Sequence, residues 1–578
     1  MARHIVMREN SVSSAEELLA GLDNDQRVVA EELRGPVCVL AGAGTGKTRA
    51  ITHRIAYAIA TGTYSPDRVL ALTFTNRAAG EMRTRLRQLG AGPVQAQTFH
   101  AAALRQLGHF WPKFVGGDAP QVFESKSRPL AEVATKLGLK LDTATLRDLA
   151  SEVEWRKTSN LNLSSYEKKA YSRAMPGNLA IADVLAVMSG YEDLKDSRGQ
   201  IDMEDVLLLT AGLLETEAAA AMEVRERYRF FVVDEYQDVS PLQHHLLDLW
   251  LGEHRDVCVV GDASQTIYSF TGATSDYLLG FGARFPDAQV VKLETNYRST
   301  APIVSIANAL MRDRPGALTL TAAQQGGSTP TLSAYPNDAA EARAVANKIA
   351  TEIAAGTKPE DIAVLYRINV QAVALEQALS DLGISTTVHG AQRFYDLPEV
   401  KQAILALRGA SVSVVGEPLF KSVSDVLRSV GWSQEAPQTT GAARSKWEAL
   451  NALMVMADEA PAGTTFRAFT DELLARQAAK HEPTLHAVTL ASVHSAKGLE
   501  WDSVHVIGLS EGLFPISYAH NLEAIAEERR LLYVAITRAR RQLSLSWAQQ
   551  GTGRATNRER SRFVAELGMH NLGAVNTP

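Results

Sequence analysis

The segment FVVDEYQDVSPLQ (231–243) places three carboxylates and an amide directly after a run of apolar residues. The apolar run predicts a buried strand, and Asp234 at its end is suited to hold the ligand shell of a magnesium ion. The next residue, Glu235, could orient and deprotonate a water molecule for phosphoryl transfer. An acidic helix N-terminus, capped by Asp238 or Ser240, would explain the same pattern without chemistry. A metal site alone would not need the amide of Gln237.

A glycine-rich segment, AGAGTGKT (41–48), follows a strand-like run and precedes a helical pattern. In this setting glycines expose backbone N–H groups to phosphates, Lys47 meets the β- and γ-phosphates, and Thr48 ligates magnesium. The strict pattern has glycine where Ala41 stands, and the strand–loop–helix setting compensates for this departure. The predicted ATP contacts in this segment are Ala41, Gly42, Ala43, Gly44, Thr45, Gly46, Lys47, Thr48 and Arg49.

Upstream of this loop, Gln26 could recognise a purine. A side-chain amide can donate to adenine N7 and accept from the N6 amino group. A surface glutamine would explain the residue equally well. The acidic segment and the glycine-rich segment together predict ATP and Mg²⁺ as cofactors, with Thr48 and Asp234 as the magnesium ligands.

The length and composition predict a multidomain globular protein. A chain of 578 residues exceeds what one hydrophobic core usually organises, and its apolar content of 46% is ordinary. No stretch is long and apolar enough for a membrane span, and the N-terminus lacks a signal-peptide pattern, so we expect a cytoplasmic, nucleoid-associated protein with no membrane partner. The net charge of −6 argues against a surface coated in positive charge, but leaves room for a local basic groove. The two cysteines, Cys38 and Cys258, lie in valine-rich runs, which favours core positions over a disulfide or zinc site.

The elements that must position these residues follow an α/β pattern. Short β-branched runs at 36–44, 68–76, 229–237, 256–264 and 288–296 each end in a loop of Gly, Thr, Asp or Asn, and a second set occurs at 361–369, 486–494, 502–510 and 541–549. Helical stretches separate these runs, as in parallel sheets covered on both faces. Each set is interrupted by a helical excursion, one near 106–205 and one near 401–485, and 322–337 is predicted to be a loop.

Further segments occur in order along the chain: TFTNRAAGEM (73–82), QTFHA (97–101), VVGDASQTIYSFTGA (259–273), LETNYRST (293–300), VTLASVHSAKGLEWDSVHVIGLSEGLFP (488–515) and EERRLLYVAITRARRQL (527–543). With the two segments above, this ordered set resembles the superfamily 1A DNA helicases of the UvrD/Rep/PcrA family, over roughly residues 21 to 566. The resemblance implies an α/β fold with two RecA-like P-loop motor domains in tandem. ATP would lie between the motor domains, and single-stranded DNA would cross their tops.

The resemblance also implies domain boundaries. Motor domain 1A would comprise 1–105 and 206–295, interrupted by helical subdomain 1B at 106–205. Motor domain 2A would comprise 296–400 and 486–568, interrupted by a short helical subdomain 2B at 401–485, and 569–578 would be a tail. The second insertion is far shorter than in typical family members, and no C-terminal accessory module is expected. The short second insertion puts the strength of unwinding in question, but not ATP-driven translocation.

Roles in ATP turnover carry over to matching positions. Gln265 resembles a γ-phosphate sensor, Tyr297 would stack on adenine, and Arg298 would reach the γ-phosphate. Glu500 would contact the nucleotide from the second domain, and Arg538 resembles an arginine finger that stabilises charge in the transition state. Without the order of the motifs, a surface salt bridge would be the simpler explanation for either arginine. The predicted catalytic residues are Lys47, Asp234, Glu235, Gln265, Arg298 and Arg538.

Coupling and DNA contact are also implied by the resemblance. Gln237, Asp238 and Gln265 would sense whether ATP or its products occupy the cleft. Aromatic residues suit a DNA path because every base offers a face for stacking, although Phe74 and Phe270 could instead be core residues. Relatives commonly have Trp-Arg where this chain has Phe270 and Thr271, so a cation between the ATP and DNA sites is missing. The predicted DNA contacts are Thr73, Phe74, Asn76, Thr98, His100, Tyr268, Phe270, Thr489, His494 and Trp501.

The leading hypothesis is an ATP hydrolase that moves 3′-to-5′ on single-stranded DNA and unwinds duplex DNA in repair or replication. An alternative is an ATP-gated DNA-binding or translocating subunit that needs a partner protein to unwind. The motor half of a helicase–nuclease is a third hypothesis, with the nuclease on another chain. A small P-loop GTPase or kinase would not need two arginines from a second α/β unit. The expected partners are single-stranded and tailed duplex DNA and a repair protein, and we expect a monomer that could self-associate on DNA.

Overall fold

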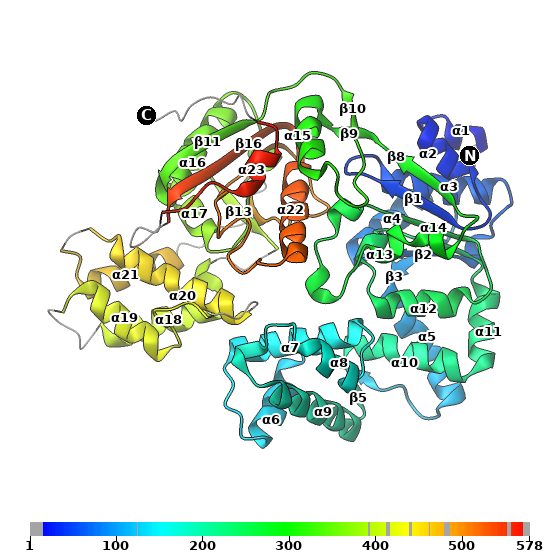
Figure 1. Ribbon diagram of the computed structural model, residues 1–578, viewed down its shortest axis with the longest axis horizontal. Coiled ribbons are helices and arrows are strands. Elements are labelled where there is room, and N and C mark those ends of the chain that lie inside the picture. Colours follow the sequence, from blue (N-terminus) through cyan, green and yellow to red (C-terminus); the bar gives the residue numbers. More distant parts are fainter. Residues whose placement is uncertain are drawn as a thin grey trace, which may run out of the picture.

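The protein contains two parallel β-sheets, each covered by helices, and two groups of helices that lie together on one side of the molecule (Figure 1). The computed structural model describes residues 15–123, 125–390, 394–411, 417–437, 442–461, 463–478, 486–551 and 557–569. Most of the predicted tail and part of the second helical excursion lie outside these residues. Among the described residues, no helix is both long and apolar enough to span a membrane.

The first sheet has six strands, and every neighbouring pair is parallel. Their order across the sheet is β3 (Gln95–Thr98), β2 (Val69–Thr73), β6 (Phe230–Val233), β7 (Val257–Gly261), β1 (Val37–Ala41) and β8 (Gln289–Leu293). Because the strands are parallel, their carboxyl ends meet at one edge of the sheet. The loops after β1, β6 and β7, which carry the predicted nucleotide residues, are therefore brought together.

The second sheet also has six parallel strands. Their order is β11 (Thr331–Asn337), β16 (Ala539–Gln550), β15 (Trp501–Val506), β12 (Ile362–Tyr366), β14 (Val488–Ser492) and β13 (Thr386–His389). A short two-stranded sheet of β9 (Thr295–Thr300) and β10 (Thr321–Gln324) lies in the segment that joins the two large sheets. The predicted tandem α/β architecture is confirmed.

All the apolar runs that were predicted as strands form strands, and Cys38 and Cys258 are buried free thiols, as expected. The prediction of a loop at 322–337 is wrong, because this segment ends β10 and forms β11. Strand β11 is an edge strand that is mostly half-buried, so its polar TLSAYPN sequence lacks the apolar pattern of the central strands. The edge strands β3 and β13 were missed for the same reason.

Helices cover both faces of each sheet (Figure 1). Those of the first sheet domain are α1 (Ala15–Leu19), α2 (Asn24–Glu31), α3 (Lys47–Ala60), α4 (Asn76–Gln88), α5 (Phe99–Phe114), α10 (Met203–Thr216), α11 (Ala218–Arg227), α12 (Pro241–Leu251), α13 (Asp276–Leu279) and α14 (Phe281–Arg284). Those of the second are α15 (Ala301–Met311), α16 (Asp338–Ala354), α17 (Gln371–Asp381), α22 (Leu522–Ile536) and α23 (Arg562–Glu566).

Two helical insertions interrupt these domains, and each has its own hydrophobic core. The first insertion contains α6 (Ser127–Lys136), α7 (Thr143–Thr158), α8 (Leu163–Ala170) and α9 (Ile181–Arg198), and the two-residue strands β4 (Gln121–Val122) and β5 (Gln200–Ile201) pair at its base. The second insertion contains α18 (Pro398–Ala410), α19 (Leu419–Ser429), α20 (Ala442–Asp458) and α21 (Phe466–Ala478).

A buried cluster of charges joins the first insertion to the first sheet domain. Lys157, at the end of α7, lies 2.8 Å from Asp202 and 2.6 Å from Asp205, which cap and begin α10. Lys195 of α9 pairs with Asp205 and lies 2.6 Å from Glu192. Lys157 and Asp202 are each 1% exposed, so this cluster depends on mutual compensation of its charges. The cluster fixes the C-terminal end of α7 on the first sheet domain.

Asp202→Asn should destabilise this junction by about 3 kcal/mol, because removing one carboxylate leaves buried ammonium groups under-compensated. Thermal unfolding of the purified chain is the measurement, and a lower midpoint is expected. Asp193→Asn, on the exposed face of α9, is the matched control and should unfold like the wild type. Equal midpoints for the two variants would contradict the structural role of the cluster.

Candidate active site and nucleic-acid interface

The phosphate loop has the geometry that the sequence predicted. Strand β1 ends at Ala41, and Lys47 is the first residue of α3. Ala41 is the last strand residue, so alanine fits where the strict pattern has glycine. Gly44 and Gly46 have φ angles of 72° and 80°, in the left-handed region that favours glycine. The loop and the N-terminus of α3 therefore form a site suited to phosphate.

Residues of the second half of the chain close over this loop. The side chain of Asn296 donates a hydrogen bond of 2.6 Å to the Ala43 carbonyl oxygen, and the backbone N–H of Tyr297 donates one of 2.9 Å to the Gly44 carbonyl oxygen. A Cβ atom on Gly44 would lie 2.8 Å from Cβ of Arg298, so only glycine allows this approach. The segment after β8 thus forms one wall of the nucleotide cleft.

Gln26 and Tyr297 lie beside the phosphate loop. The amide of Gln26, which is 3% exposed, donates a hydrogen bond of 2.9 Å to the Thr45 carbonyl oxygen. Its role here is to hold the loop, and recognition of adenine stays a prediction. Tyr297 is 42% exposed and its hydroxyl bonds to Asp23, which caps α2, so the ring is accessible for stacking. Arg49, in the first turn of α3, is exposed and bonds to the carbonyl oxygen of Gly21.

The predicted magnesium ligands lie together. The hydroxyl of Thr48 is 3.4 Å from Oδ2 of Asp234, which directly follows β6. Burial and the neighbouring charge of Glu235 raise the pKa of Asp234. A divalent cation would supply the missing positive charge, and a hydroxyl with one carboxylate is the kind of oxygen-ligand set that Mg²⁺ uses alongside phosphates. These two residues therefore fit a magnesium ion.

Glu235 has a constrained backbone and a lowered pKa. Its φ of 52° is uncommon for a residue other than glycine, and such strain concentrates at functional sites. Although burial alone would raise the pKa of Glu235, the ammonium groups of Lys47 and Lys497 lower it. The amide of Gln237 also donates a hydrogen bond to its carboxylate. A deprotonated carboxylate held in one orientation is what a general base for water requires.

The amide in the acidic segment links that segment to the loop after β7. The Gln237 side-chain oxygen accepts a hydrogen bond of 2.9 Å from the Asp262 backbone N–H, and the Asp262 carboxylate accepts one of 2.7 Å from the Gln265 amide. Ser240, with Gln243, caps α12, so Asp238 is not needed as a helix cap. The predicted coupling residues Gln237, Asp238 and Gln265 therefore form one bonded group.

Lys497 reaches this group from the second sheet domain. Its ammonium forms an ion pair with Asp238 and donates a hydrogen bond of 2.7 Å to the Gln265 carbonyl oxygen. Burial raises the pKa of Asp238 to about 6, even though Lys497 opposes this shift. The same ammonium lies 4.9 Å from the centre of the Tyr268 ring. Lys497 therefore provides a cation between the nucleotide cleft and the aromatic residues, the kind of group that the sequence lacks at Thr271.

Two arginines converge in the cleft. Arg298 pairs with Glu500 and donates a hydrogen bond of 3.1 Å to the Thr537 carbonyl oxygen. Arg538, which is 1% exposed, donates to the Thr537 hydroxyl at 3.1 Å and to the Gln265 side-chain oxygen at 3.3 Å. Burial and the Arg298 guanidinium lower the pKa of Arg538 to about 9. The hydrogen-bond partners of Arg538 are uncharged oxygens, so an anionic phosphate would be a favourable partner.

Four aromatic side chains form a chain of contacts across the two domains. The ring centre of Phe74 lies 5.4 Å from that of Tyr268, and Phe270 lies 6.1 Å from Tyr268 and 6.0 Å from His494. Phe74 is 39% exposed and Phe270 is 57% exposed, so neither is a core residue. Burial lowers the pKa of His494 to about 3, which makes its ring neutral at physiological pH. Exposed aromatic faces of this kind are suited to stacking on bases.

The other predicted DNA contacts differ in how accessible they are. Asn76 is exposed at the start of α4, and Thr489 is half-buried on β14. Thr73 is buried and bonds to the Thr75 carbonyl oxygen, and Thr98 caps α5. His100 is half-buried, and burial lowers its pKa to about 4.

The prediction that Trp501 contacts DNA does not agree with its position. Trp501 is 7% exposed and packs in the hydrophobic core between the second sheet and α22. Trp501 is the first residue of β15 and directly follows Glu500, which lies in the cleft. This motif therefore contributes a core residue at the start of the strand. A tryptophan that follows a functional glutamate cannot be separated from a core tryptophan by sequence alone.

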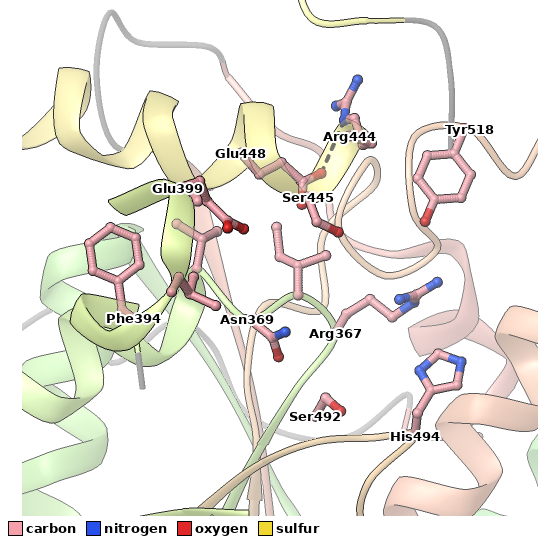
Figure 2. Close-up of a pocket in the computed structure, with 14 residues that line it drawn as sticks. Arg367, Asn369, Phe394, Glu399, Arg444, Ser445, Glu448, Ser492, His494 and Tyr518 are labelled. Atoms are coloured by element: carbon pink, nitrogen blue, oxygen red, sulfur yellow. Dashed lines mark hydrogen bonds and ion pairs between the residues drawn. The ribbon is translucent and has the colours of Figure 1, made fainter. Parts of the chain in front are cut away.

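A cavity of about 240 Å³ adjoins the aromatic residues, between the second sheet domain and the second insertion. Arg367, His494 and Tyr518 line one side of it, and Glu399 and Glu448 line the other (Figure 2). Because His494 belongs to both, the cavity borders the row of aromatic side chains.

Sequence reasoning missed several residues that the structure brings into the cleft. Asn296, Lys497 and Tyr533 all occur within the motifs used for recognition, but none was assigned a role. The hydroxyl of Tyr533 accepts a hydrogen bond of 3.4 Å from the Ala43 backbone N–H. A lysine three residues before a glutamate gave no signal by itself, since only folding brings Lys497 to Asp238.

Two parallel sheets with a phosphate loop on one and converging arginines from the other define a two-domain P-loop nucleoside triphosphatase. Comparisons with known proteins agree with this class. Residues 22–286 match the UvrD/REP helicase N-terminal domain, and residues 291–411 and 418–550 match the UvrD-like helicase C-terminal domain. The chain belongs to the UvrD/Rep helicase family.

Among its relatives, ATP-dependent DNA helicase UvrD2 of Mycobacterium tuberculosis (strain ATCC 25618 / H37Rv) is 46% identical over 576 residues, covering 95% of this chain and 82% of the relative. DNA helicase II of Escherichia coli (strain K12) is 30% identical over 644 residues, covering 95% and 88%. ATP-dependent DNA helicase PcrA of Bacillus subtilis (strain 168) is 28% identical over 648 residues, covering 95% and 86%.

Lys497→Met should uncouple ATP turnover from DNA, because it leaves the buried Asp238 carboxylate without its cation. We expect the stimulation of ATP hydrolysis by oligo(dT) to fall at least about tenfold, which corresponds to ~1.4 kcal/mol of lost coupling. The measurement is steady-state ATP hydrolysis with and without oligo(dT). Lys401→Met, at an exposed pair on α18, is the matched control. Unchanged stimulation in Lys497→Met would show that this lysine does not couple the two sites.

Proposed function

We propose that this ATP-dependent DNA helicase moves 3′-to-5′ along single-stranded DNA and unwinds duplex DNA in repair or replication. The observation that carries the proposal is the nucleotide cleft itself, to which the first sheet domain contributes the phosphate loop and the second contributes Arg538. A site built from two domains is complete only when they close, so turnover can be converted into relative motion. The polarity and the cellular pathway rest on the family resemblance.

ATP hydrolysis would use residues from both walls. The loop after β1 and Lys47 would bind the phosphates, with Mg²⁺ held between Thr48 and Asp234 to neutralise phosphate charge. Glu235 would orient the attacking water and accept its proton. Arg298 and Arg538 would face the charge that develops on the transferred group. The contact of Glu500 with Arg298 supports a role for this glutamate in placing the arginine.

Movement on DNA would follow from the bonded group around Gln237. Loss of the γ-phosphate would change the surroundings of Gln265, whose carbonyl oxygen bonds to Lys497 and whose amide bonds to Asp262. The ring of Tyr268 lies against Lys497, so the change would reach the aromatic path. Alternating grip on the bases by the two domains would then produce steps along the strand.

We also propose the division into two motor domains with two insertions. The described helices support narrower bounds for the first insertion than 106–205, because α5 and α10 pack in the core of the first sheet. The second insertion begins close to the expected position, with α18 at Pro398.

A partner-dependent translocase is the second candidate. The alignment with the Escherichia coli relative extends over 644 positions, more than the 578 residues of this chain, so that relative contains segments that this chain lacks. A short second insertion could leave the motor intact and weaken strand separation. In this case a repair protein, or a second copy on DNA, would supply the missing function to an otherwise monomeric motor.

Strand displacement by the purified chain distinguishes these candidates. Matched duplexes with a 3′ or a 5′ single-stranded tail are incubated with Mg²⁺ and ATP. We expect displacement from the 3′-tailed duplex only, and none with Glu235→Gln, which should bind ATP but not hydrolyse it. Hydrolysis stimulated by DNA without displacement would favour the partner-dependent translocase. Displacement only from the 5′ tail, or hydrolysis indifferent to DNA, would contradict the proposal.

A further inference from the structure

Helix α7 of the first insertion contacts two other parts of the molecule. One is the loop after β7, which carries Gln265, and the other is the second insertion. At its C-terminal end, the Thr158 hydroxyl lies 2.8 Å from the Thr271 carbonyl oxygen. Thr271 belongs to the short turn Ser269–Thr271, a few residues after Gln265. A Cβ atom on the following Gly272, whose φ is 89°, would lie 2.9 Å from the Thr158 hydroxyl. The helix end is therefore packed closely against the loop that carries Gln265, Tyr268 and Phe270.

The end of α7 at Thr158 is fixed on the first sheet domain. Lys157, next to Thr158, belongs to the buried charge cluster with Asp202 and Asp205 of α10. The helix has 16 residues and is about 24 Å long. A helix anchored at one end acts as a rigid lever, so its other end reports the position of the first sheet domain.

The N-terminal half of α7 is held by the second insertion. We call the contacts made there the latch. Asp142, which caps α7, lies 2.7 Å from the ammonium of Lys446, and Asp148 accepts hydrogen bonds from the backbone N–H groups of Ala442 and Ala443 at the start of α20. A further latch contact joins Arg147 and Glu399, which lie 3.6 Å apart.

The charges that the two insertions present to each other in the latch are complementary. Asp148 is 9% exposed and its carboxylate faces the first N–H groups of α20, where the helix dipole favours negative charge. The ammonium of Lys446 pairs with Asp142, the residue that caps α7. Each insertion therefore presents a charge that the other neutralises, which is typical of a specific contact rather than of incidental proximity.

The latch connects the first sheet domain, through α7, to the second sheet domain, through the second insertion. The second insertion lies between β13 and β14, which are paired neighbours in the second sheet, so the chain attaches it to that domain at both ends. Helix α7 is anchored on the first domain. Any change in cleft width must therefore break the latch, strain it, or move the second insertion relative to its own domain.

We propose that α7 is a strut that couples the ATP cleft to the position of the second insertion, with Thr158 and Asp148 as positioning residues near its two ends. In the structure, α7 contacts the loop after β7 at one end and the second insertion at the other. The cleft is closed, with Asn296 and Tyr297 bonded to the phosphate loop, and the latch is formed. The latch therefore belongs to the closed, ATP-binding arrangement, and opening of the cleft releases it.

Release of the latch has a consequence for the aromatic path. Helix α20 contributes Arg444 and Glu448 to the cavity that His494 lines from the second sheet domain (Figure 2). Movement of α20 away from α7 changes the width of this cavity. The strut would thereby transmit the state of the nucleotide to the far end of the proposed DNA path, independently of Lys497.

The proposal rests on the proposed ATP-driven motor, and thermodynamic linkage gives it a direct test. If the latch favours the closed cleft by some factor, then breaking the latch must weaken the binding of a nucleotide that requires closure by that same factor. The probe is a fluorescent, non-hydrolysable ATP analogue with Mg²⁺, titrated into the full chain. Lys446→Met and Asp148→Asn remove the latch charges, and neither residue lies in the nucleotide or DNA machinery.

We expect each latch variant to bind the analogue about 5-fold more weakly than the wild type. Lys421→Met and Asp425→Asn, an exposed pair on α19 of the same insertion, are the matched controls and should bind like the wild type. Affinities of the latch variants equal to those of the controls would overturn the proposal. A wild-type chain that hydrolyses no ATP with DNA present would instead contradict the proposed function itself.

A second measurement tests the strut without touching the latch. Dyes on Lys136→Cys and Arg428→Cys report the distance between the insertions, and the two native cysteines are buried and should not be labelled. We expect the analogue to change this distance in the otherwise wild-type chain, and Thr158→Val to reduce the change by at least half. Ser151→Ala, on the exposed face of α7, is the control. A nucleotide response that is absent, or is identical with and without Thr158→Val, would contradict the strut.

Discussion

The buried guanidinium of Arg538 is the interaction on which the nucleotide cleft depends. It lies between the domains, beside a second guanidinium, with uncharged oxygens as its hydrogen-bond partners. A buried cation without a compensating anion is costly, and a bound phosphate relieves that cost. Closure of the domains and binding of nucleotide therefore stabilise each other. In the proposed motor, this physical link would allow hydrolysis to drive a change in the relative position of the two sheets.

Two sets of contacts connect the nucleotide cleft to more distant parts of the molecule. In each set, a buried or half-buried charged side chain joins one domain to the other. Lys497 of the second domain neutralises Asp238 of the first and lies against Tyr268. Helix α7 begins at the latch on the second insertion and ends at the buried charge cluster in the first domain. Charged contacts are suited to this function because their free energy depends steeply on distance and solvent, so small displacements have large effects.

Much of this arrangement could be predicted from the sequence, because parallel strands with apolar runs bring their loops to one edge. The phosphate loop, Asp234 and Glu235 were located in this way, and the resemblance added Arg298 and Arg538. What could not be predicted depends on contacts between distant segments. Nothing in the sequence pairs Lys497 with Asp238, or Asp148 with the start of α20. The polar edge strand β11 and the core position of Trp501 were missed because their local patterns are shared by loops and by exposed aromatic residues.

The most direct test of this account is single-turnover ATP hydrolysis by Arg538→Ala, in the presence of single-stranded DNA, together with its affinity for ATP. If bound phosphate compensates the buried guanidinium, and the charge that develops during cleavage is compensated further, Arg538→Ala should weaken ATP binding and slow cleavage by about 10³-fold. Cleavage within a few-fold of the wild-type rate would contradict the account. In that case the two sheets would close around ATP without the second domain contributing to hydrolysis.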